Sequence, residues 1–208
     1  MTSRRGFTLV EVLVAVMLTG ILTTLALAPV VVTVRRAVET QEEYSDLSAL
    51  SRTINFIARD LFSAMRISSN VVTIKDHEAI GGHDDDVLMV MSTSTIAQDM
   101  PPGTIVYKIA EGGILHSNII PGLYRWIFPG KLPNTINIDT LNGDEGQLVL
   151  PGVNEFCVEV PVNSHEDERR KEYTGLLPKG IYIKIGRLKN EQDRENNLNE
   201  LESVIVFP

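Results

Sequence analysis

The sequence predicts an α+β protein in which one long N-terminal helix carries an antiparallel β-sheet head. Residues 7–34 form an apolar run with Glu11 as the one charge, and about 20 apolar residues suffice to span a bilayer as a helix. Beyond this run, apolar residues recur at spacings of three and four as far as Met65, which is typical of one face of a helix. From Val71 onward, short β-branched runs alternate with turns rich in Gly, Pro and Asp, which indicates strands.

Charge and composition exclude several classes of function. The chain of 208 residues has a net charge of −8, which argues against nucleic-acid binding, because that needs clustered Lys and Arg. The single cysteine, Cys157, excludes an intramolecular disulfide, and its strand-like surroundings predict a buried, inert thiol. No P-loop, G-x-S-x-G or C-x-x-C motif occurs, and no two histidines stand at a metal-binding spacing. We therefore expect no enzyme activity and no cofactor.

Glu11 is the unusual residue of the apolar run. A carboxylate inside a membrane segment costs roughly 3 kcal/mol on insertion scales, so such a residue suggests a function and a cationic partner. Basic residues flank the run on both sides, with Arg4 and Arg5 before it and Arg35 and Arg36 after it. The positive-inside rule is therefore nearly balanced and orients the segment only weakly.

The stretch from Arg4 to Glu11 resembles the prepilin processing site of type IV pilins and type II secretion pseudopilins. A short basic leader, a glycine, a phenylalanine, a spaced glutamate and an apolar run follow one another at the N-terminus. The resemblance implies that a prepilin peptidase cuts between Gly6 and Phe7 and methylates the new amine of Phe7. It implies that Glu11 faces that amine, in its own or a neighbouring subunit. Removal of residues 1–6, which contain Arg4 and Arg5, changes the net charge from −8 to −10.

Three other interpretations of the same segment stay open. A secretory signal peptide would use the A-x-A at residues 26–28, but the apolar region is too long and Pro29 would follow the cut. A twin-arginine signal would use Arg4 and Arg5, although the leader before them is very short. If the segment is a plain signal anchor, Glu11 has no function and is merely tolerated in the membrane.

The helix is predicted to continue from Phe7 to about Met65, roughly 90 Å at 1.5 Å per residue. Pro29 removes one helical hydrogen bond, so we expect a kink or a local loosening there. The apolar stripe beyond the membrane is expected to face the core of the head, and it consists of Leu47, Leu50, Ile54, Ile57, Leu61 and Met65. The charged residues expected largely off the stripe are Glu42, Asp46, Arg52, Arg59 and Asp60.

The head is expected to be one α+β domain with an antiparallel sheet, or two sheets, packed on the helix. The predicted strands are 71–75, 87–92, 104–109, 114–118, 123–128, 147–150, 153–160, 180–188 and 203–207. Glu111, Gly112 and Gly113 are expected to form a hairpin turn, and residues 129–146 an irregular segment. The predicted organisation is a leader at 1–6, a transmembrane helix at 7–34, its amphipathic continuation at 35–67 and the head at 68–208.

Asp84, Asp85 and Asp86 are the candidates for a metal site in the head. Three neighbouring carboxylates could bind calcium, which prefers several oxygen ligands, but the spacing fits no EF-hand. A solvated turn before the strand at 87–92 is the favoured interpretation. The charged run at 166–171 is expected to be a solvated loop or to help select a neighbouring subunit.

Short segments of the head resemble those of J-type minor pseudopilins and some minor pilins, namely residues 50–54 and 58–61, 106–109 with 113–115, 153–156 and 177–181. The resemblance implies a single-pass protein of the bacterial inner membrane with its head in the periplasm. It implies that the protein lies at the tip of a type II secretion pseudopilus, or that it is a minor pilin that primes a type IV pilus. The implied partners are other pilins or pseudopilins, prepilin peptidase, the inner-membrane assembly platform and the lipid bilayer.

Overall fold

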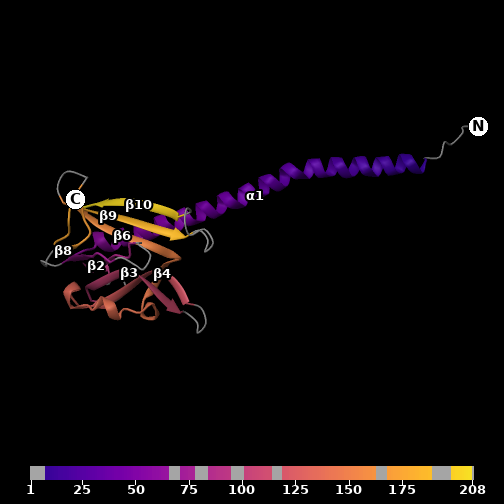
Figure 1. Ribbon diagram of the computed structural model, residues 1–208. Helices are drawn as coiled ribbons and strands as arrows, with labels where there is room; N and C mark the ends of the chain where they lie inside the picture. The colour runs from indigo at the N-terminus through magenta and orange to yellow at the C-terminus, as the bar shows by residue number, and fades with distance from the viewer. Residues whose placement is uncertain are drawn as a thin grey trace, which may run out of the picture. The chain divides into compact units, whose positions relative to one another are not determined.

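The computed structural model describes residues 8–65, 71–77, 84–94, 101–113, 119–162, 168–188 and 198–207. It combines one long N-terminal helix with an antiparallel β-sheet domain, which is an α+β fold of the pilin-like type (Figure 1). Its contacts divide the chain after Asp46 into two compact units, which we describe separately. The predicted fold class is therefore confirmed.

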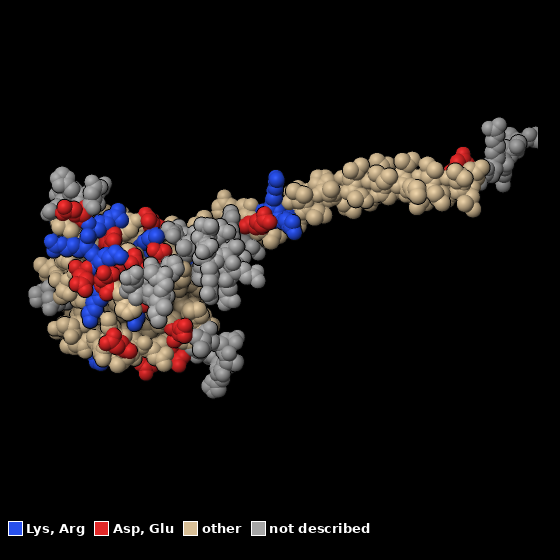
Figure 2. Space-filling view, in the orientation of Figure 1, with Lys and Arg blue, Asp and Glu red and all other residues tan. Residues whose placement is uncertain are grey.

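Helix α1 (Leu9–Phe62) begins in the apolar run and is long and apolar enough to cross a membrane, with a mean hydropathy of 2.2 in its candidate span. Figure 2 shows this part of the helix as a tan surface, uninterrupted by acidic or basic side chains between its two charged ends. Threonine hydroxyls along it donate to carbonyls one turn back, for example Thr19 to Ala15 at 2.7 Å and Thr23 to Thr19 at 2.7 Å. The hydroxyls that would otherwise be costly in lipid are thus satisfied within the helix.

α1 continues as helix through Pro29, whose carbonyl accepts the Thr33 hydroxyl at 2.8 Å. A kink at Pro29 stays a prediction. The helix ends at Phe62, three residues before the predicted end at Met65. The backbone leaves the helix there because it turns to meet strand β2, where Ala64 bridges Ser92 and Met65 N donates to Met91 O at 2.9 Å. The predicted helical continuation to residue 67 is therefore wrong for Ser63, Ala64 and Met65.

The strands of the head form two antiparallel sheets within the described residues. The first has six strands in the order β5-β4-β3-β2-β1-β8, and the second has four in the order β10-β9-β6-β7. The bounds of the first sheet in chain order are β1 Val72–Lys75, β2 Val87–Ser92, β3 Gly103–Gly113, β4 Ile119–Pro129, β5 Gln147–Pro151 and β8 Tyr173–Gly175. Those of the second are β6 Val153–Pro161, β7 Arg169–Arg170, β9 Gly180–Leu188 and β10 Leu198–Val206.

The main core of the head joins the C-terminal part of α1 to both sheets. The predicted stripe is confirmed for Leu50, Ile54, Ile57 and Leu61, which are buried among strand residues of both sheets. Leu47, at the other end of the stripe, is 45% exposed. The helix segment is therefore held by apolar burial, since each fully buried aliphatic side chain contributes about 1.5–3 kcal/mol.

A second, smaller core covers the opposite face of the six-stranded sheet. It consists of Val87, Met89, Val106, Tyr124 and Trp126. The segment predicted to be irregular packs on it through three short 3₁₀ turns, η2 (Pro133–Thr135), η3 (Ile138–Thr140) and η4 (Gly143–Glu145). Figure 1 shows these turns beneath β3 and β4. The segment is thus a covering layer, with Trp126 Nε1 donating to Asn142 O at 2.9 Å.

The predicted hairpin turn at 111–113 is wrong. Glu111, Gly112 and Gly113 continue β3 and pair with Pro121, Ile120 and Ile119 of β4. Gly112 instead allows the backbones of β3 and η4 to lie close together, because a Cβ on Gly112 would lie 2.7 Å from the carbonyl carbon of Gly143. The strand predicted at 114–118 lies outside the described residues.

Candidate functional site

Glu11 lies in the first turn of α1 and forms a reciprocal cap with Thr8. Its Oε2 accepts from the Thr8 backbone N–H at 3.0 Å and from the Thr8 hydroxyl at 3.1 Å. Glu11 N in turn donates to Thr8 Oγ1 at 3.3 Å. A Thr and a Glu three residues apart form a capping box, which satisfies donors that the helix start would otherwise leave unpaired.

The cap gives Glu11 a local structural role beside the predicted pairing role. Ala15 and Thr19 follow Glu11 at spacings of four and eight on the same side of the helix, and their side chains are small. Small residues let membrane helices approach closely. Gly6 and Phe7, the predicted cleavage pair, lie outside the described residues, so the role of Glu11 toward an amine stays a prediction.

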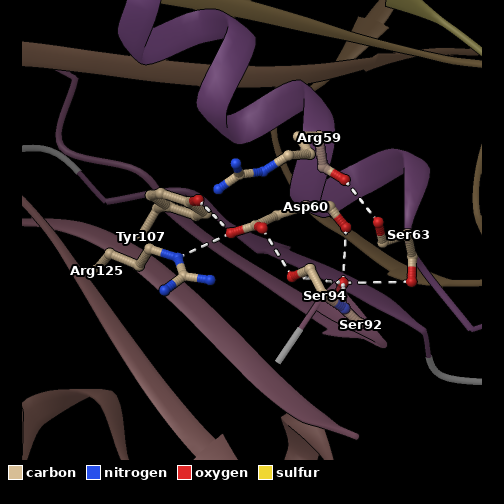
Figure 3. Close-up of polar contacts among 7 residues, drawn as sticks. All are labelled: Arg59, Asp60, Ser63, Ser92, Ser94, Tyr107 and Arg125. Carbon is tan, nitrogen blue, oxygen red and sulfur yellow. Dashed lines mark hydrogen bonds and ion pairs between the residues drawn. The ribbon is translucent and has the colours of Figure 1, made fainter. Parts of the chain in front are cut away.

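Asp60 anchors the other end of α1 in the head through a buried polar cluster (Figure 3). Its Oδ2 accepts from Arg125 Nε at 2.8 Å and from the Tyr107 hydroxyl at 2.6 Å, and its Oδ1 accepts from the Ser94 hydroxyl at 2.7 Å. Ser92 Oγ donates to the Asp60 carbonyl at 2.9 Å. Four segments of the chain therefore meet at one carboxylate.

Asp60 was expected largely off the apolar stripe, and its side chain is nevertheless fully buried. Arg125 is 2% exposed, and the two side chains form an ion pair that excludes water. Burial, together with the nearby Asp60 charge, raises the pKa of Tyr107, so its hydroxyl stays protonated and donates. Arg125 Nη1 is buried without a hydrogen-bond partner in the structure.

The residue spacing on α1 and the alternation on β4 could have predicted this cluster. Thr53, Ile57 and Asp60 recur at spacings of four and three, which puts Asp60 beside the stripe rather than opposite to it. Arg125 alternates with Leu123 on the core side of β4, while Tyr124 and Trp126 face the second core. An acidic residue on the buried side of α1 and a basic residue on the buried side of β4 together indicate a buried ion pair.

Asp84, Asp85 and Asp86 do not form the solvated turn that was predicted. They connect the two sheets, since Asp86 N donates to Phe156 O at 2.8 Å and Phe156 N donates to Asp84 O at 2.8 Å. Asp86 is fully buried, and its Oδ2 accepts from Val158 N at 2.7 Å. The segment is held from both sides because its backbone and its carboxylates already have protein partners.

The three carboxylates point to different partners instead of one metal ion. Asp84 pairs with Lys171 at 2.7 Å, and Asp85 with His77 at 3.3 Å. Within the described residues no group of three His, Cys, Asp or Glu side chains could hold a metal ion. The calcium interpretation therefore finds no support in this part of the chain.

Burial and ion pairs shift the pKa values of these groups in opposite directions. Partial burial acts to raise the pKa of Asp84, but the hydrogen bonds from Lys171 and Cys157 and the charges of Lys171 and Lys184 together lower it. Burial raises the pKa of Asp86 to about 6, although the backbone N–H groups of Val158 and His77 favour its charged form. Asp86 therefore titrates closer to neutral pH than an exposed aspartate does.

Cys157 and the histidines complete the predicted candidates. Cys157 is a buried free cysteine, as predicted, and burial raises the pKa of its thiol, which disfavours the nucleophilic thiolate. His77 has a side chain 51% exposed beside Asp85. His83, His116 and His165 lie outside the described residues. The part of the chain that the structure describes therefore shows no catalytic arrangement of these groups.

Comparison with known proteins gives a match at the N-terminus. Residues 1–27 match the family model described as the prokaryotic N-terminal methylation motif, a type IV pilin-like prepilin cleavage signal. No curated protein matches the chain, and no solved structure matches it. The motif supports a type IV pilin-like or pseudopilin-like protein and a structural subunit that is processed by prepilin peptidase and assembles with other pilins. The apolar helix with this motif is consistent with membrane anchoring.

Proposed function

We propose that this protein is a minor pseudopilin, a structural subunit at or near the tip of a type II secretion pseudopilus. The observation that carries the proposal is the methylation motif at residues 1–27, which runs directly into the uncharged stretch of α1 after Glu11. Cleavage between Gly6 and Phe7 creates a cationic amine, which is then methylated. The head stands in the periplasm and the helix in the inner membrane.

The carboxylate of Glu11 gives the assembly step a physical basis. A buried carboxylate is costly alone and tolerable beside a fixed cation, so an amine of Phe7 lowers the cost of keeping Glu11 in lipid. The partner amine belongs to the same subunit or to a neighbour. Pairing with a neighbour fixes the axial register of the two helices, and the small side chains of Ala15 and Thr19 beside Glu11 favour close packing there.

The buried cluster of Asp60 supports a role for the head as a rigid platform. Force or torque on α1 reaches the six-stranded sheet through Arg125 and Tyr107, which hold one carboxylate of the helix. Asp60 lies in residues 58–61, the segment that resembles J-type minor pseudopilins. In this proposal the rigid head presents the surface that selects the neighbouring subunit.

A minor pilin that primes a type IV pilus is the alternative with the same processing. A plain signal-anchored periplasmic domain is the remaining one. The minor pseudopilin and the minor pilin share the motif and the anchor, and they differ in the subunits that contact the head. Site-specific photocrosslinking from the head in the native host, followed by mass spectrometry, identifies those subunits and distinguishes a secretion system from a pilus.

Intact-mass measurement after co-expression with a prepilin peptidase tests the processing. We expect the mass to fall by that of residues 1–6 and to rise by one methyl group. Replacement of Gly6 by a larger residue should leave the chain uncut, which provides the matched control. An uncut wild-type chain would leave only the plain anchor, and a cut after Ala28 would indicate a secreted domain.

A further inference from the structure

The groove between α1 and the open edge of β5 has the features of a peptide-binding surface. Its walls are Ala49, Arg52, Thr53 and Phe56 of the helix and residues 147–150 of the strand, around a volume of about 320 Å³. β5 is the end strand of the six-stranded sheet and pairs on one side with β4. The other side of its backbone therefore faces the groove.

β5 differs from the other described sheet edges in charge, although it ends in Pro151 and its pairing with β4 contains a bulge. Its five residues, QLVLP, carry no charge. The edge strand β10 contains Glu202, the edge strand β7 is the pair Arg169–Arg170, and β8 has three residues. Natural proteins usually block exposed edges with charges or keep them very short, so an uncharged open edge indicates a place where another strand adds.

The helix wall of the groove is preformed and basic. Two guanidinium groups contact the Phe56 ring, with Arg59 Cζ 4.7 Å and Arg125 Cζ 5.2 Å from its centroid. Arg52 is exposed, its guanidinium donates to the Ser48 hydroxyl at 2.8 Å, and it forms no ion pair in the described residues. Arg59 is also exposed without an ion pair in that part of the chain. Arg52, which lines the groove, and Arg59 are thus exposed cations without an ion pair in the described residues, in a chain of net charge −8.

We propose that this groove binds an extended acidic segment of a partner protein, which adds a strand to the β5 edge and pairs a carboxylate with Arg52. Neighbouring strands lie about 4.8 Å apart, so a strand added to β5 would occupy the space beside the helix. The small side chains Ala49 and Thr53 leave room there for its backbone. Main-chain hydrogen bonds provide affinity, and the arginines select acidic over basic segments. The proposal is independent of the cleavage at Gly6.

The test uses the full-length protein in detergent micelles and two labelled nonapeptides. In the first, valine alternates with glutamate, and in the second lysine replaces each glutamate. We expect the acidic peptide to bind, measured by fluorescence polarisation, and the lysine peptide to bind at least about tenfold more weakly, a difference of about 1.4 kcal/mol. Arg52→Glu should weaken binding of the acidic peptide by a similar factor. Lys131→Glu, a matched charge change on another exposed residue, should leave that binding nearly unchanged.

Hydrogen exchange locates the bound peptide. We expect slower exchange of the β5 amides when the acidic peptide is present, and unchanged exchange in β10, the longest other edge. Three results would overturn the proposal: no binding of the acidic peptide, an equal effect of Lys131→Glu, or protection that falls outside β5. Self-association of the full-length chain that Arg52→Glu abolishes would assign the groove to a second copy and would likewise overturn it.

Discussion

Asp60 of α1 and Arg125 of β4 form an ion pair at 2.8 Å, and their side chains are 0% and 1% exposed. The two residues are separated by 65 positions in the chain, so the pair joins the end of the long helix to β4, the strand next to the edge strand β5. Tyr107, the cross-strand neighbour of Arg125, donates to the same carboxylate. A buried pair with this many hydrogen bonds fixes the helix in one register on the sheet, which apolar contacts alone specify less sharply.

Removal of one member of this pair should strongly destabilise the head. Arg125→Met leaves the Asp60 carboxylate buried without its cation, and we expect a loss of about 3–5 kcal/mol in the free energy of unfolding. Urea denaturation of the full-length protein in detergent, followed by fluorescence of the single tryptophan, Trp126, measures this loss. Arg170→Met, at an exposed arginine, should change the stability by less than about 0.5 kcal/mol.

A double variant separates the cost of an unpaired charge from the value of the pair. Asp60→Leu combined with Arg125→Met removes both charges, so it should recover much of the stability lost in Arg125→Met. A double variant as unstable as the sum of the two single variants would contradict this account and would indicate that the pair itself supplies the stability.

Glu11→Gln distinguishes the capping role of Glu11 from its proposed pairing role. Glutamine can also accept hydrogen bonds from Thr8 in a capping box, but it carries no charge to pair with an amine. We therefore expect Glu11→Gln to insert into the membrane and be cleaved normally, yet to be incorporated poorly into filaments. Shearing of filaments from cells and immunoblotting of the subunit measure incorporation.

Thr8→Ala provides the complementary variant. It removes the hydroxyl that Glu11 N and Glu11 Oε2 contact, and it leaves the charge of Glu11 in place. We expect nearly normal incorporation of Thr8→Ala. Normal incorporation of Glu11→Gln together with loss in Thr8→Ala would assign Glu11 to the helix cap alone.

Asp86 should make the stability of the head depend on pH. Its pKa is about 6 in the folded protein, against about 3.9 in an unfolded chain. A raised folded-state pKa contributes stability that is fully present below the unfolded value and is lost as the pH rises toward and through 6. Urea denaturation between pH 4 and pH 7 should therefore show a wild-type stability that falls, relative to Asp86→Asn, as the pH rises. Parallel pH profiles of the two proteins would contradict the assignment.

Gly143→Ala should loosen the layer of 3₁₀ turns from the six-stranded sheet. A Cβ at this position would lie 2.6 Å from Glu111 O and 2.7 Å from Gly112 Cα, so the backbones must move apart. We expect a loss of about 1–3 kcal/mol and a red shift of Trp126 fluorescence, because this layer covers the indole. Gly180→Ala, where the nearest atom is 3.4 Å away, should leave both the stability and the spectrum nearly unchanged.

Hydrophobic patterns predicted the regular elements well. The strands at 87–92 and 180–188 occur at the predicted residues, and the stripe on α1 is buried from Leu50 to Leu61. Turns were less predictable, since Gly112 and Gly113 have the composition of a hairpin turn yet extend β3 against β4. Glycine allows a turn, but here it allows close contact with Gly143, which only the fold brings near.

The sequence by itself determined the anchor, the motif before it and the α+β class, because these depend on local composition and on periodicity along the chain. Only the tertiary structure decided which charged residues lie inside. The burial of Asp60, Asp86 and Arg125 depends on distant partners, since Asp60 and Arg125 are separated by 65 positions and Asp86 and Val158 by 72. A buried charge is stable only where distant donors and acceptors meet it, and the positions of those groups follow from the packing of α1 and the two sheets.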